Sequence, residues 1–137
     1  MGDILFLPVK PRWAKLIMSG KKTLELRKRL PTRGYGNQCV IYASSPQCEI
    51  VGTCVFVDCG RIVTLDNDLL DRACVTRSEY DAYFGQGEGH AIVLSSPHVF
   101  MHGISLATMR ERWKLEPPQQ WRYIDRKTLD EIYEAGR

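Results

Sequence analysis

Short apolar runs separated by polar breaks follow one another along most of the chain. The first run, Ile4 to Val9, predicts a strand, and the next apolar positions recur at helical spacing, which predicts a helix over residues 12–19. Gly20 follows directly, as expected for a left-handed residue that ends a helix. Trp13 lies on the apolar face of this helix, so we expect it to anchor the helix in the core.

The later apolar runs extend this alternation of strands and helices. Strands are predicted at three further segments: 39–43, 49–57 and 90–95. Helices are predicted at four segments, the second of them capped by Ser78: 66–73, 78–84, 105–113 and 129–133. Many short strands with short helices between them indicate an α+β fold, a mixed β-barrel of about five to six strands with short flanking helices.

Residues 23–30 alternate apolar and polar side chains, which places two leucines on one face of a strand and Glu25 and Arg27 on the other. Lys22 reaches the face of Glu25 only if this strand begins after it; an earlier start would direct it to the opposite face. Lys22 and Arg27 could hold a phosphate while Glu25 orients them or accepts from a base. A surface ladder of ion pairs is the simpler interpretation of the same spacing.

The net charge of +3 is unevenly distributed. From Lys10 to Arg33, nine basic residues accompany one acid, a local charge of +8, whereas the rest of the chain carries −5. A basic cluster on an acidic body predicts a polyanion partner, with single-stranded or looped RNA favoured and DNA as the alternative. A solvated basic face without a partner is the competing interpretation. The predicted nucleic-acid-binding residues are Lys10, Arg12, Gly20, Lys21, Lys22, Glu25, Arg27 and Arg29.

Other classes of site find little support in the sequence. The five cysteines are irregularly spaced, and because neither Cys-x-x-Cys nor His-x-x-x-His occurs, we predict no metal, no cofactor and no disulfide. His90, His98 and His102 are dispersed and are expected to be polar surface residues and not catalysts. No apolar run approaches the roughly 18 residues of a membrane span, and no secretion signal precedes the first strand. We therefore expect a single domain over residues 1–137, soluble and cytoplasmic, of undetermined oligomeric state.

The segment from Phe6 to Pro31 contains the pattern Gly-x-Lys-x-x-Glu-x-Arg, formed by Gly20, Lys22, Glu25 and Arg27. It resembles the amino-terminal signature of ASCH domains. Later blocks extend the resemblance over nearly the whole chain: Val40 to Pro46, Ile50 to Phe56, Tyr80 to Leu94 and Pro117 to Ile124. The resemblance, to small bacterial or phage members, implies a PUA-like β-barrel, a cleft lined by the motif, and RNA binding or RNA-linked regulation.

Two branches of that family imply an enzymatic alternative, a hydrolase of RNA or acylated nucleosides with Lys22 and Glu25 as catalytic residues. One branch hydrolyses acetylcytidine with the motif lysine, a threonine at the position of Glu25, and a glutamate on a later helix. That glutamate would fall just after Asp71, where no Glu occurs, so this reaction is disfavoured. Another relative is reported as a ribonuclease, for which Lys22, Tyr42 and the serines near Ser95 are candidate acid–base groups. An RNA-binding domain is the first hypothesis.

Overall fold

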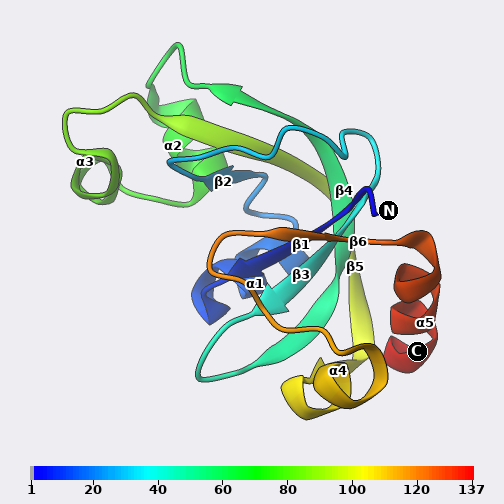
Figure 1. Ribbon diagram of the computed structural model, residues 1–137. Helices are drawn as coiled ribbons and strands as arrows, with labels where there is room; N and C mark the ends of the chain where they lie inside the picture. Colours follow the sequence, from blue (N-terminus) through cyan, green and yellow to red (C-terminus); the bar gives the residue numbers. More distant parts are fainter. Residues whose placement is uncertain (1) are drawn as a thin grey trace.

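The computed structural model describes residues 2–137, which form a six-stranded mixed sheet with five helices. The strands are β1 (Ile4–Val9), β2 (Leu24–Leu26), β3 (Gln38–Ala43), β4 (Glu49–Arg61), β5 (His90–Ser105) and β6 (Arg122–Ile124). The helices are α1 (Pro11–Met18), α2 (Asn67–Ala73), α3 (Arg77–Phe84), α4 (Leu106–Trp113) and α5 (Arg126–Gly136). The long strands β4 and β5 run the length of the molecule, with α2 and α3 near one end and α4 and α5 near the other (Figure 1).

The strands pair in the order β2-β5-β4-β3-β1-β6. Strands β1 and β3 are parallel, and every other pair in this order is antiparallel. The order has two ends, because the three-residue strands β2 and β6 each pair with one neighbour among the described residues. The α+β class is therefore confirmed, but the expected PUA-like β-barrel is not, since this sheet is open.

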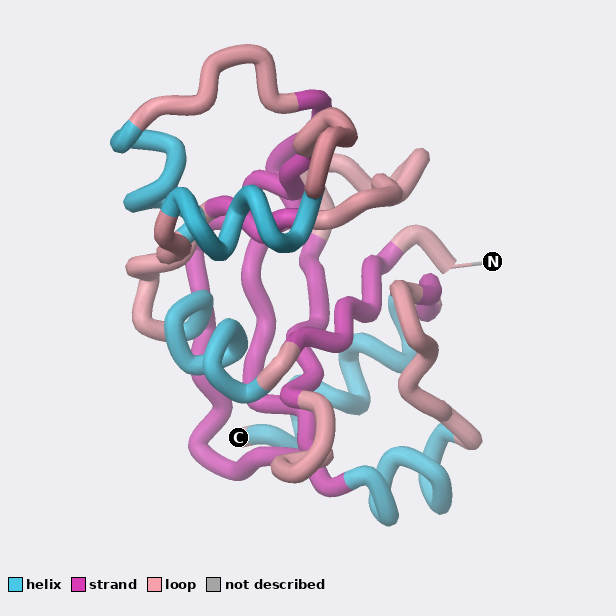
Figure 2. The backbone as a smooth tube through the Cα atoms, turned by 90° about the vertical axis from the view of Figure 1, so that its left-hand side faces the viewer, coloured by secondary structure: helices cyan, strands magenta, loops and turns pink. Residues whose placement is uncertain are grey.

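Both faces of the central strands are buried. One face packs against α1 through alternate residues of β1 and β3, among them Leu5, Leu7, Cys39 and Ile41. The intervening residues pack on the opposite face against α4 and α5, among them Ile4, Phe6, Val40 and Tyr42. Burial on both faces explains why these strands read as continuous apolar runs in the sequence. In Figure 2 the helices again lie on different sides of the sheet.

Most helix boundaries follow the expected signals, although α5 extends three residues beyond its predicted span at each end. Helix α1 begins with a proline, whose missing N–H is not needed there, and Gly20 beyond its end has a φ of +83°. Helix α3 begins earlier than predicted: its cap is Thr76, which forms a reciprocal capping box with Glu79, and not Ser78. Among residues 2–137 we find no helix with the length and apolar character needed to cross a membrane.

Four strands differ from the prediction, and one of them, β4, continues to Arg61, four residues beyond its expected end. The strand expected over 23–30 is limited to Leu24–Leu26, because its ladder with β5 ends there and the chain then turns away. Strand β5 continues to Ser105 through register shifts against β4, which accommodate Pro97 within the strand. Strand β6 was not predicted, because three residues beside Trp121 are too few to show a period.

Candidate functional site

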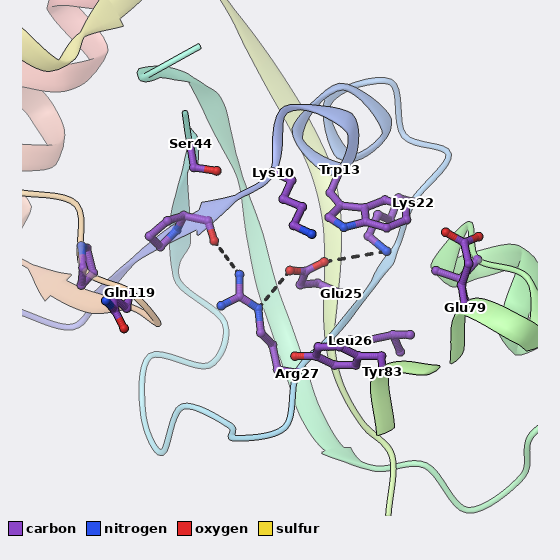
Figure 3. Close-up of a pocket in the computed structure, with 13 residues that line it drawn as sticks. Lys10, Trp13, Lys22, Glu25, Leu26, Arg27, Ser44, Glu79, Tyr83 and Gln119 are labelled. Carbon is purple, nitrogen blue, oxygen red and sulfur yellow. Dashed lines mark hydrogen bonds and ion pairs between the residues drawn. The ribbon is translucent and has the colours of Figure 1, made fainter. Parts of the chain in front are cut away.

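A pocket of about 400 Å³ opens between α1, β2 and α3, and the ends of β1 and β3 and the loop before β6 complete its walls. Its lining residues are Pro8, Lys10, Trp13, Lys22, Glu25, Leu26, Arg27, Ser44, Val75, Glu79, Tyr83, Pro118 and Gln119. Figure 3 shows Glu25 between Lys22 and Arg27 and joined to both, with Glu79 on α3 beyond Lys22. The pocket therefore combines buried charges with aromatic side chains.

Lys22 is 2% exposed although it carries an ammonium group. Because β2 begins only at Leu24, the direction of the Lys22 side chain is not set by the alternation of the strand. The backbone N–H of Lys22 donates to the Leu16 carbonyl at 3.1 Å, which closes the end of α1. Its Nζ donates to the Ala73 carbonyl and lies 3.7 Å from Glu25 Oε1. Burial lowers the pKa of Lys22 from its ordinary value, and the nearby Glu25 carboxylate opposes part of that change.

The same Nζ lies 4.3 Å from the centre of the Trp13 ring, close enough for a cation–π contact. Trp13 also packs against the core cluster on the α1 face of the sheet. The expected core anchor is therefore also a wall of the pocket, with its ring against the motif lysine.

Arg27 links three walls of the pocket through its guanidinium group. Its Nε donates to Glu25 Oε2 at 2.9 Å, its Nη2 to the Pro8 carbonyl at 2.5 Å, and its Nη1 to the Gln120 carbonyl at 3.1 Å. Pro8 belongs to β1, Glu25 to β2, and Gln120 to the loop before β6. Each guanidinium nitrogen thus already has a partner inside the protein, so Arg27 holds the pocket walls together.

Charged and aromatic groups also border the pocket near its opening. Lys10 is exposed and takes part in none of the ion pairs or side-chain hydrogen bonds found within residues 2–137. Arg12 donates from Nη1 to Glu79 Oε2 at 2.9 Å, and its guanidinium carbon lies 4.3 Å from the Trp13 ring centre. The hydrogen bond from Arg12, and then that from the Thr76 backbone, lower the pKa of Glu79. Tyr83, 40% exposed, completes this side.

The predicted binding residues divide into three groups. Four of them line the pocket: Lys10, Lys22, Glu25 and Arg27. Arg12 contacts the pocket residue Glu79, whereas Gly20, Lys21 and Arg29 are exposed and do not line the pocket. Gly20 has a conformational role instead, because its positive φ lets the chain reverse after α1.

Tyr42 and Ser95, the suggested acid–base partners of Lys22, are not brought into this pocket. Tyr42 points to the α4 and α5 face, its ring centre 5.8 Å from that of Phe6, and burial raises its pKa to about 12. Ser95 lines a separate cavity of about 140 Å³ that Lys22 also borders. The hydroxyl groups that do line the pocket belong to Ser44 and Tyr83.

Sequence reasoning also missed Glu79, the acid that α3 supplies to the pocket. A family glutamate was sought just after Asp71, where none occurs. Glu79 and Tyr83 are four residues apart and therefore share one face of α3, a spacing that could have indicated a common role. Within residues 2–137 no group of three or more His, Cys, Asp or Glu side chains is placed to hold a metal ion.

Comparisons with known proteins support the family resemblance. A model of the ASCH domain family matches residues 7–97. An ASCH domain-containing ribonuclease from Zymomonas mobilis subsp. mobilis is 28% identical over 125 residues, which cover 89% of this chain and 84% of that protein. A crystal structure of ASCH from Zymomonas mobilis matches with a TM-score of 0.84 at 24% identity, over 98% of this chain and 96% of that one.

A more distant likeness, like the match to the Zymomonas structure, supports the fold alone. The N-terminal domain of Staphylothermus marinus McrB matches with a TM-score of 0.64 at 9% identity, over 99% of this chain and 96% of that one.

Proposed function

This chain belongs to the ASCH domain family, and we propose that it binds single-stranded or looped RNA in the pocket formed by α1, β2 and α3. One observation carries the proposal: at its edge the pocket has Lys10, a cation with no ion-pair partner among residues 2–137, and inside it has a buried ionic array, Lys22–Glu25–Arg27. The ribonuclease name of the Zymomonas relative supports RNA as the ligand.

The division of charge suggests how a nucleotide would bind. Lys10 and Arg12 are near the surface and would contact phosphate, whereas the desolvated Lys22 and Glu25 lie where a base would enter. Trp13 and Tyr83 offer aromatic surface for the base, and Glu25 retains carboxylate lone pairs that can accept from a base amino group. An unpaired base suits a pocket of this size better than a duplex, whose bases are stacked.

Fluorescence anisotropy with labelled single-stranded RNA, a duplex of the same sequence and single-stranded DNA tests this proposal. We expect the single strand of RNA to bind most tightly, with an affinity that falls steeply with salt. Tyr83→Ala should weaken binding, whereas Tyr35→Ala, at a tyrosine that is 48% exposed and outside the pocket, should not. Equal binding of duplex and single strand, or equal effects of the two variants, would contradict a pocket for unpaired RNA.

A second candidate function, cleavage of RNA, is favoured by the lowered pKa of Lys22. A larger neutral fraction of this amine would let it take the proton of a ribose 2′-hydroxyl as the 2′ oxygen attacks the adjacent phosphorus. The bond from phosphorus to the 5′ oxygen then breaks, water protonates that oxygen, and a 2′,3′-cyclic phosphate remains. The name of the Zymomonas relative agrees with this activity.

Product analysis of labelled RNA, with EDTA and with added magnesium, tests cleavage. The expected product is a 2′,3′-cyclic phosphate, absent with Lys22→Met and absent when the substrate has a 2′-deoxyribose at the cleaved position. Cleavage that persists in Lys22→Met would remove Lys22 from the reaction, and binding without any cleavage would leave the first function alone.

A further inference from the structure

The ion pair between Arg12 and Glu79 joins two helices across the pocket. Arg12 is the second residue of α1, and Glu79 lies in the first turn of α3. The two side chains are 60% and 36% exposed, and Arg12 has no other ion pair among the described residues. In the free protein, one of the surface cations best placed for phosphate is therefore occupied by a carboxylate of the same chain.

The two carboxylate oxygens of Glu79 have different partners. Oε1 accepts from the Thr76 backbone N–H at 3.0 Å and so completes the capping box of α3, whereas Oε2 accepts from Arg12. Release of Arg12 would leave the cap intact. The contact with Arg12 can thus open without unwinding α3.

We infer that Glu79 is a specificity-determining residue that occupies Arg12 until a phosphate of the ligand replaces it. This inference rests on the proposed function, because it concerns how RNA gains access to Arg12. A phosphate can accept two parallel hydrogen bonds from a guanidinium group, whereas Glu79 accepts a single hydrogen bond from Arg12. A ligand of low charge would not displace Glu79, so the exchange favours polyanions over neutral nucleosides.

The exposure of the Arg12–Glu79 ion pair limits how strongly Glu79 can change the affinity for a polyanion. Exposed ion pairs stabilise proteins only slightly, so their replacement by phosphate requires little free energy. Removing the negative charge of Glu79 should tighten polyanion binding by about two- to fivefold.

A double-mutant cycle tests the inference, with the affinity for single-stranded RNA measured in the wild type, Arg12→Ala, Glu79→Gln and the double variant. Glutamine is an accepted capping-box residue, so Glu79→Gln should unfold at the same temperature as the wild type. The control is Glu88→Gln, which removes one charge from an ion pair with Arg61 outside the pocket, whose side chains are 60% and 63% exposed.

We expect Glu79→Gln to tighten binding more than Glu88→Gln, and this advantage to disappear in the Arg12→Ala background. The inference would be overturned if Glu79→Gln and Glu88→Gln increased the affinity equally, or if the increase from Glu79→Gln remained in the Arg12→Ala background. Either result would mean that Glu79 acts only by general repulsion of the polyanion. Weaker binding by Glu79→Gln would also overturn the inference, since Glu79 would then be a ligand contact.

Inorganic polyphosphate, measured in parallel, separates this inference from the RNA function. Tighter polyphosphate binding by Glu79→Gln, dependent on Arg12, would support the exchange even if RNA did not bind and the proposed function failed. Binding of RNA and polyphosphate that is unchanged by Glu79→Gln would overturn the exchange and leave the RNA function intact.

Discussion

Lys22 Nζ lies 3.7 Å from Glu25 Oε1, and the two side chains are only 1% and 7% exposed. An isolated ammonium group at this depth would be strongly disfavoured, so the carboxylate is its essential counter-charge. Glu25 in turn receives Arg27, which is fixed to two backbone carbonyls. The protonation of Lys22 is therefore controlled by burial on one side and by this ionic array on the other.

Glu25→Gln should lower the pKa of Lys22 further, because it removes the largest influence that raises this pKa while burial persists. The rate at which an amine reagent modifies Lys22, followed by mass spectrometry across a pH series, reports this pKa. The profile should move to lower pH in Glu25→Gln and remain in place in Glu116→Gln, a surface partner of Arg110. A profile that does not move would mean that Glu25 is not the counter-charge of Lys22.

The stability of the protein should depend on the pH through Lys22. Because its folded pKa lies below the unfolded one, the unfolded chain binds more protons between these two values, and the free energy of unfolding rises with pH there. The slope from this residue is at most about 1.4 kcal/mol per pH unit and ends near pH 10.4.

Urea unfolding, in reductant from about pH 7 to 10, measures the free energy of unfolding of the wild type and of Lys22→Met. The difference between the two free energies at each pH is the contribution of Lys22. Subtraction removes the thiol and tyrosine titrations that the two proteins share. A difference that does not increase with pH would contradict a lowered lysine pKa.

The local elements of this site were largely predictable, whereas the assembly of its walls was not. After Gly20 the helical spacing of apolar residues gives way to alternation, which predicted that Glu25 and Arg27 share one face of a strand. Whether Lys22 joins them depends on where the strand begins, and the structure places that start at Leu24. Glu79 enters from a helix more than fifty residues later, placed by tertiary packing that no local period records. The strand pairing that leaves the sheet open is likewise a non-local property.

Arg27→Lys should destabilise the fold although it conserves the charge. A lysine cannot reproduce three donors in a planar arrangement, so at least one of the Pro8 and Gln120 carbonyls loses its partner. The expected loss is about 1–3 kcal/mol in the free energy of unfolding, measured by urea denaturation. Arg29→Lys, at an exposed position outside the pocket, is the matched control and should change it by less than about 0.5 kcal/mol. Equal stabilities of the two variants would mean that Arg27 does not hold the pocket walls.

Lys10→Ala should alter the salt dependence of RNA binding. This exposed lysine has no ion-pair partner in the part of the chain that the structure describes, so a phosphate that it contacts releases counterions. The slope of the logarithm of affinity against that of salt should become less steep by about 0.7, the value for one contact on a single strand. The ratio of the wild-type affinity to the Lys10→Ala affinity should therefore fall about fivefold over a tenfold rise in salt concentration. Lys127→Ala removes the same charge from α5, outside this pocket, and should leave the slope unchanged. Equal slopes for the wild type and Lys10→Ala would show that Lys10 does not contact phosphate. The RNA backbone would then lie against other basic residues between Lys10 and Arg33.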